Sequence, residues 1–149
     1  MKTTSCILKA FLLGTLILPF TACNAQKRNI TFKELPATAQ TFIKANFPNQ
    51  ATAYIIEDKD ITHTEYEIRF TGGAEVEFDG SGNWKEVDMN RNLIPTAIVP
   101  KNISGYLARN YKGMQVEKIE KKHYGYKVES TTDIELQFDK SGNFLRIDD

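Results

Sequence analysis

The chain has 149 residues, with 19 basic and 19 acidic side chains and a formal net charge of zero. The charges are interspersed along the sequence, which argues against a nucleic-acid-binding surface and against a polybasic membrane-binding tract. Both cysteines, Cys6 and Cys23, lie near the N-terminus, so the body of the protein has no cysteine for a disulfide framework or for thiol chemistry.

The N-terminal segment predicts export. Lys2 and Lys9 are followed by an apolar stretch at residues 10–20, which is shorter than the roughly 20 residues of a membrane-spanning helix. Such a segment is typical of a secretory signal peptide, which we assign to residues 1–22, and the polar residues 23–29 are expected to form a flexible tether.

Two positions for cleavage of the signal peptide are compatible with the sequence. Residues 20–23, Phe-Thr-Ala-Cys, resemble a bacterial lipobox, in which case Cys23 is the lipidation residue and becomes the new N-terminus. The alternative is ordinary cleavage after Ala25. We therefore expect a protein of the Gram-negative periplasm, either free or held at the membrane only through a lipid on Cys23.

Two helices are predicted 64 positions apart. The first begins at Leu35-Pro36, because proline is favoured at the first helical position, and it stops at Pro48-Asn49. The second begins at Val99-Pro100 and stops at Lys112-Gly113, where glycine suits a left-handed cap. One face of each helix is apolar, formed by Ala39, Phe42, Ile43 and Phe47 in the first and by Ile103, Tyr106, Leu107 and Tyr111 in the second.

Four short antiparallel strands are predicted after each helix, because apolar and polar residues alternate there with a period of two. They comprise residues 53–58, 66–70, 74–78 and the segment after the turn at 79–83 in the first unit, and residues 116–121, 126–129, 134–138 and the segment after the turn at 139–143 in the second. Both turns read Asp-x-Ser-Gly-Asn. The chain is therefore interpreted as an internal duplication of one unit, which consists of a helix followed by four strands.

The expected fold is α+β, a tandem repeat of one helix plus a four-stranded antiparallel sheet, with units at residues 30–92 and 93–149. A single unit of this size is near the lower limit for stability, so we expect the two units to share a core and a continuous sheet. The connection at residues 89–98 is fairly apolar, and we expect it to pack against the units.

The chain resembles the PepSY-like domains of exported bacterial proteins, which are grouped structurally with the β-lactamase-inhibitor-protein fold. The resemblance rests on Leu35-Pro36, on the helix with Phe42-Ile43 and Asn46-Phe47-Pro48, and on the strand and turn from Val76 to Trp84. It implies a curved sheet with the helices on one face and an open concave face opposite. In the inhibitor protein the open sheet clamps an enzyme, and related domains are associated with restraining envelope proteases, so an inhibitor-like role is an analogy.

A surface for a protein or peptide partner of the envelope is expected on the open face. The polar residues that alternate with core residues would form it, namely Glu67, Arg69, Glu75, Glu77, Lys127, Glu129 and Glu135. Alternation along the last strand of each unit would place Trp84 and Phe144 on the opposite side to Val87 and Ile147. Both aromatic residues would then lie on the open face as binding hot spots. The alternative interpretation is that each aromatic residue closes the end of the core after a bulge at the turn.

Binding of a ligand or of calcium is the alternative function. The turns at residues 79–83 and 139–143 place Asp, Ser and Asn oxygens at positions one, three and five, but they lack the glycine and glutamate of a calcium loop and fit ordinary turns. His63 and His123 lie in separate units without neighbouring ligands and are expected at the surface. The sequence has no catalytic set or phosphate-binding loop, so neither enzymatic activity nor a cofactor is expected.

Overall fold

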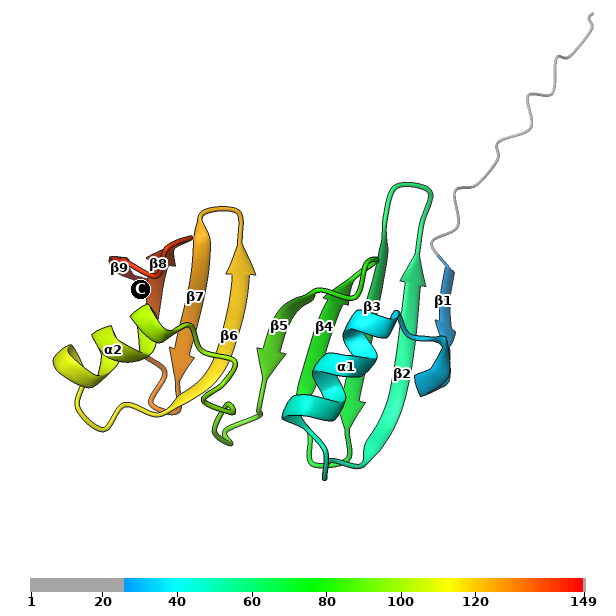
Figure 1. Ribbon diagram of the computed structural model, residues 1–149, viewed down its shortest axis with the longest axis horizontal. Coiled ribbons are helices and arrows are strands. Elements are labelled where there is room, and N and C mark those ends of the chain that lie inside the picture. Colours follow the sequence, from blue (N-terminus) through cyan, green and yellow to red (C-terminus); the bar gives the residue numbers. More distant parts are fainter. Residues whose placement is uncertain (1–25, 149) are drawn as a thin grey trace, which may run out of the picture.

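The computed structural model of the protein describes residues 26–148, so the predicted signal peptide and Cys23 lie outside the described residues. The described part contains two α-helices, a short 3-10 helix and nine strands (Figure 1). In chain order these are β1 (Gln26–Asn29), η1 (Phe32–Glu34), α1 (Ala37–Asn46), β2 (Thr52–Lys59), β3 (Thr64–Phe70), β4 (Glu75–Asp79), β5 (Trp84–Asp88), α2 (Lys101–Asn110), β6 (Val116–Lys122), β7 (Gly125–Ser130), β8 (Glu135–Asp139) and β9 (Phe144–Asp148).

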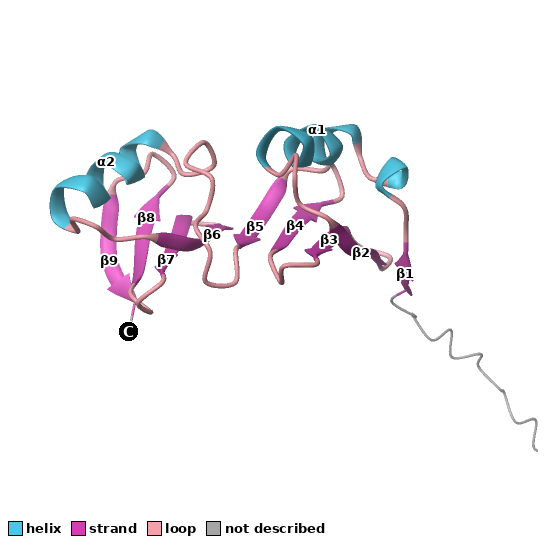
Figure 2. Cartoon of the chain, turned by 90° about the horizontal axis from the view of Figure 1, so that it is seen from below, coloured by secondary structure: helices cyan, strands magenta, loops and turns pink. Residues whose placement is uncertain are grey.

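The nine strands form one antiparallel sheet in the order β1 to β9, so each strand pairs only with its neighbours in the sequence. The pairing of β5 with β6 joins the two halves, through Glu86 with Glu120, Val87 with Ile119 and Asp88 with Lys118. Both helices lie on the same side of the sheet (Figure 2). No described element covers the opposite side, which we call the open face. The predicted α+β class and the single antiparallel sheet are confirmed.

The two helices begin and end close to where the sequence predicts. Pro36 and Pro100 are the N-cap residues of α1 and α2, one position before the first helical residue. Both helices are ten residues long. The backbone N–H groups of Phe47 and Tyr111 close the last turns by donating to carbonyl groups four residues earlier, each at 2.8 Å. Neither of these helices is long and apolar enough to cross a membrane.

The core lies between the helices and the sheet. Ala39 and Ile43 of α1, and Ile103 and Leu107 of α2, are buried against it. The strands contribute side chains that are at most 1% exposed, namely Ile68, Phe70, Val76, Phe78, Val87, Ile119, Val128, Leu136 and Phe138. Full burial of such a side chain is worth about 1.5–3 kcal/mol, and a one-residue slip would turn a whole strand outward. The alternating pattern therefore determines the register.

The flexible tether predicted for residues 23–29 is wrong for its described part. Residues 26–29 form β1, which pairs antiparallel with β2. The Arg28 Nε atom donates a hydrogen bond to Glu57 at 2.5 Å. All four side chains of β1 are exposed, so this strand is stabilised by backbone pairing and surface ion pairs, and a hydrophobic pattern could not reveal it.

The connection between the halves packs as predicted. Met89, Ile94 and Ile98 are buried, while Leu93 is 51% exposed. The Ile94 backbone N–H donates to the carbonyl of Val116 at 3.0 Å, which fixes the connection beside the first residue of β6. The connection therefore belongs to the folded body and contributes to the core.

Candidate functional site

The open face carries four glutamates side by side across the middle of the sheet. Glu67 of β3, Glu77 of β4, Glu86 of β5 and Glu120 of β6 are successive partners in the strand register. Side chains directly opposite one another on antiparallel strands have Cβ atoms about 5 Å apart, and like charges there destabilise a sheet. We call these four residues the glutamate row. Both halves of the chain contribute to it.

Cations pair with three members of the glutamate row, and Arg69 is the partner of Glu67 at 3.9 Å. Lys118 Nζ lies 2.6 Å from Glu86 and 3.9 Å from Glu120. The ion pairs among the described residues leave Glu77 without a cation. The pKa of Glu77 is raised, first because the side chain is partly buried and next because Glu86 lies beside it. Glu77 is therefore the one member of the row that has no ion pair among the described residues.

The structure places the predicted polar residues on the open face in two groups, one on β3 and β4 and one on β7 and β8, with β5 and β6 between them. They are Glu67, Arg69, Glu75, Glu77, Lys127, Glu129 and Glu135. Lys127 Nζ lies 2.5 Å from Glu135, and Arg69 pairs with Glu75. Their role in partner binding stays a prediction. Sequence reasoning missed Glu86 and Glu120, because the register of β4 with β5 aligns Glu86 with Glu77 and the pairing between the halves adds Glu120, and alternation along one strand gives neither register.

Trp84 and Phe144 do not lie on the open face, so that prediction is wrong. A register shift in the β4–β5 pairing, and another in β8–β9, places each ring opposite a core phenylalanine. The Trp84 ring stacks on Phe42 of α1, with centroids 6.2 Å apart and planes at 28°. Phe144 stacks on Tyr106 of α2, with centroids 4.8 Å apart and planes at 9°. The extra residue of a bulge reverses the alternation, so both residues close the end of the core.

The two Asp-x-Ser-Gly-Asn turns are held by their own backbone. Asp79 Oδ1 accepts hydrogen bonds from the N–H groups two and four residues later, at 2.9 Å each, and Asp139 does the same at 2.8 Å. Hydrogen bonds from Asn143 lower the pKa of Asp139. Burial by itself would raise the pKa of Asp79, but the hydrogen bonds that Asp79 accepts outweigh burial, and its pKa is lowered. Ordinary turn chemistry thus already engages both carboxylates.

The described residues contain no group of three or more His, Cys, Asp or Glu side chains placed to hold a metal ion. His63 and His123 are exposed, in the β2–β3 and β6–β7 connections respectively. His63 Nδ1 lies 3.2 Å from Asp60, whose pKa is lowered to about 2, chiefly by a hydrogen bond from the Thr62 hydroxyl. The surface placement predicted for both histidines is confirmed.

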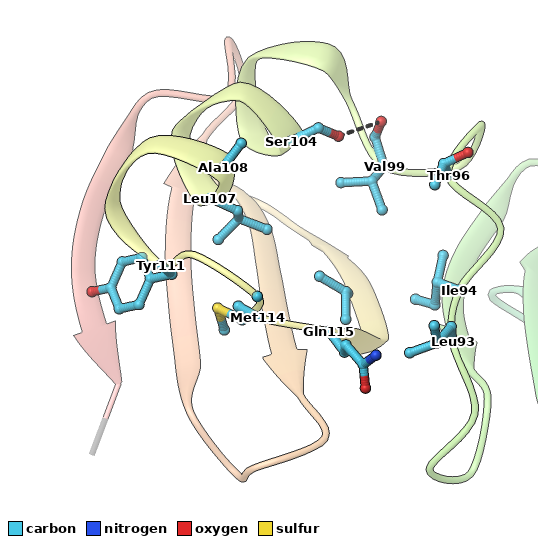
Figure 3. A pocket seen from close by; sticks show the side chains of 12 residues that line it. Leu93, Ile94, Thr96, Val99, Ser104, Leu107, Ala108, Tyr111, Met114 and Gln115 are labelled. Carbon is cyan, nitrogen blue, oxygen red and sulfur yellow. Dashed lines mark hydrogen bonds between the residues drawn. The ribbon is translucent and has the colours of Figure 1, made fainter.

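An apolar groove of about 370 Å³ lies beside α2 (Figure 3). Its walls come from α2, from the connection between the halves and from the start of β6. The side chains around it are mostly apolar and include Leu93, Ile94, Val99, Leu107, Tyr111 and Met114. The groove lies on the helix side, away from the open face, and the sequence patterns gave no sign of it.

The corresponding positions of the first half carry larger side chains. Thr96, Ser104 and Ala108 of the groove stand 64 positions after Phe32, Gln40 and Lys44. Phe32 packs against the core, with Lys44 Nζ 5.6 Å from its ring centroid. Smaller side chains therefore stand at these positions of the second half, where the groove lies.

The sequence matches the PepSY-like family, described as "Putative beta-lactamase-inhibitor-like, PepSY-like", over residues 21–70 and 64–146. No curated protein matches this chain. Among similar solved structures is a "putative periplasmic protein" of the DUF2874 family from Bacteroides vulgatus, 36% identical, with a TM-score of 0.78 and coverage of 83% of this chain and 97% of that one.

Two further solved structures are similar over 83% of this chain. One, from Bacteroides thetaiotaomicron, is described as a "putative calcium-regulated periplasmic protein"; it is 37% identical, with a TM-score of 0.79 and 97% of its own chain covered. The other is a "putative periplasmic protein of unknown function" from Bacteroides vulgatus, 32% identical, with a TM-score of 0.79 and all of its chain covered. The family match and these identities show that the chain belongs to the PepSY-like family.

Proposed function

We propose that this protein is a non-enzymatic binding module of the periplasm, whose open face binds a protein or peptide partner with a cationic surface. The observation that carries the proposal is the glutamate row on a face that no described element covers. Like charges in direct register reduce the stability of a sheet, and a cationic partner would convert that repulsion into attraction. An inhibitor-like or regulatory role follows by analogy with the family description.

The proposal includes a tandem repeat as the architecture of the module. The element order α1-β2-β3-β4-β5 recurs as α2-β6-β7-β8-β9, and the family matches twice along the chain. The proposal also includes export through a signal peptide at residues 1–22, with Cys23 as the candidate lipidation residue. The periplasmic descriptions of the three similar structures support export.

Neutralising the middle of the glutamate row is expected to weaken partner capture severalfold without loss of stability. The pKa of Glu77 is raised in the folded protein, so its charge costs stability at neutral pH, and that cost disappears as the pH falls through the folded pKa. Glu77→Gln removes the same charge, so the melting temperature should stay level or rise while binding falls. Partners would be captured from periplasmic extract by cross-linking, identified by mass spectrometry, and compared between the variant and the wild type.

Asp133→Asn is the matched control for this experiment, because it removes one exposed carboxylate from the β7–β8 turn, outside the glutamate row. The control should capture the same partner as the wild type, and capture by both should weaken as salt is added. Equal capture by the Glu77→Gln variant would overturn the open face as the site. Captured proteins without a basic surface would overturn the proposed electrostatic recognition.

Regulation by calcium is the second candidate function, favoured by the description of the similar Bacteroides thetaiotaomicron protein. A ligand that binds only the folded state raises the melting temperature. Under the first proposal we instead expect excess calcium to leave the melting temperature unchanged, because the carboxylates of Asp79 and Asp139 already accept hydrogen bonds from their own turns. A rise that a chelator reverses, and that Asp79→Ala or Asp139→Ala abolishes, would contradict this expectation and place calcium in the turns.

A further inference from the structure

Within residues 26–148 the outer edge of β9 is free, whereas the equivalent edge of β5 in the first half is paired with β6. Val87 of β5 and Ile147 of β9 each pair inward with a buried residue of the preceding strand. Val87 is fully buried, but Ile147 is 52% exposed. The edge of β9 therefore presents an aliphatic side chain that a further strand would cover.

The backbone of β9 is oriented to accept such a strand. The N–H of Met89 donates to Glu117 of β6 at 2.9 Å, so Val87, two residues earlier, also directs its backbone groups toward β6. Ile147 occupies the same place in β9, which means that its N–H and carbonyl groups point away from the sheet. Edge strands of this kind are templates for pairing with another chain.

The two charged residues beside Ile147, Arg146 and Asp148, have opposite signs and could pair with each other between two copies of β9. On a two-fold axis through Ile147, an antiparallel copy of β9 would place the two Ile147 side chains opposite each other. Arg146 of each copy would then face Asp148 of the other, on the open face. Cross-strand pairs of opposite charge stabilise a sheet, and so do paired aliphatic residues. Arg146 is 66% exposed, and its Nη2 atom lies 3.4 Å from Asp148 of the same chain, so the dimer would exchange this exposed contact for one with Asp148 of the second copy.

The other free edge of the sheet does not offer the same match. All four side chains of β1 are exposed and polar, so this edge has no aliphatic residue that a further strand would cover. A two-fold axis perpendicular to the sheet at β9 also keeps the helices of both copies on one side. It leaves both open faces uncovered, so this surface is separate from the proposed partner site.

We propose that a second copy of this chain binds the outer edge of β9, forming a two-fold symmetric dimer with one continuous sheet centred on Ile147. The partner is identified by charge complementarity between Arg146 and Asp148 and by the self-pairing of Ile147. Because such an edge contact is small, the dimer forms reversibly and its population depends on protein concentration. The dimer has the two-fold symmetry that most soluble homo-oligomers adopt.

A charge-swap experiment tests this dimer by sedimentation equilibrium at concentrations up to about 1 mM, which covers weak association. Wild-type protein should dimerise, and R146D and D148R should each be monomeric, because each places like charges opposite one another. The R146D/D148R double variant should dimerise again, and an equimolar mixture of the two single variants should form heterodimers. Melting curves verify that each variant is folded. A monomeric wild type, or single variants that dimerise as well as the wild type, would overturn the proposal.

Discussion

Replacing Gly125 with alanine is expected to lower the free energy of unfolding by about 3 kcal/mol or more, because it forces the backbones of β7 and β8 apart. Gly125 has a φ of +151° and begins β7 opposite Asp139. A Cβ atom added there would lie 2.2 Å from the carbonyl oxygen of Phe138 and 2.2 Å from the carbonyl carbon of Asp139. Urea unfolding followed by circular dichroism would measure the loss.

Gly113→Ala separates conformational strain from contact. Gly113 also has a positive φ, +81°, but a Cβ atom added there would have no heavy atom within 4 Å. Its replacement should cost only the strain of the left-handed conformation, about 1–2 kcal/mol. If both variants lost the same stability, the close approach of β8 to Gly125 would not be the cause.

Trp84→Ala is expected to cost about 3 kcal/mol of unfolding free energy, although Trp84 lies near the surface. Its ring lies against Phe42 of α1, and Lys121 Nζ of β6 stands 3.9 Å from its centroid. Trp84 therefore connects the helix of the first half to the first strand of the second half. An exposed aromatic residue on the open face would cost little when removed, so this measurement distinguishes the two placements directly.

Phe144→Ala is the matched variant for Trp84→Ala. Phe144 stacks on Tyr106 in the same way, but it belongs to the edge strand β9. We expect its loss to cost less, about 1–2 kcal/mol, because a side chain with fewer neighbours leaves less of a void. Equilibrium unfolding of both variants under one set of conditions provides the comparison. An unchanged stability for Trp84→Ala would contradict the packing described for the α1 face.

Hydrophobic periodicity predicted the helices and most strands because burial determines them. Ile68, Val76 and Phe78 are buried on one face of their strands, as the alternation requires. Strand β1 has no buried side chain, so periodicity could not detect it. The side on which Trp84 lies depends on a bulge, and the Asp-x-Ser-Gly-Asn turn does not reveal whether an extra residue follows it.

The candidate surfaces were harder to predict than the fold. The polar side of each strand was evident, but the glutamate row requires the register between β5 and β6, which pairs residues of different halves. The groove beside α2 lies where three residues are smaller than their counterparts in the first half, Thr96, Ser104 and Ala108, and none of them is unusual by itself. Such features depend on which residues meet across the fold, and a local pattern contains no information about those contacts.

The simple strand order has a consequence for how the chain folds. Because each strand pairs only with its neighbours in the sequence, no pairing spans more than one intervening helical segment. Most of the pairings are hairpins with short loops, so the entropy lost in closing those loops is small and folding should be fast for a sheet protein. Pairing can start in either half and spread strand by strand, with β5 and β6 joining the two growing sheets.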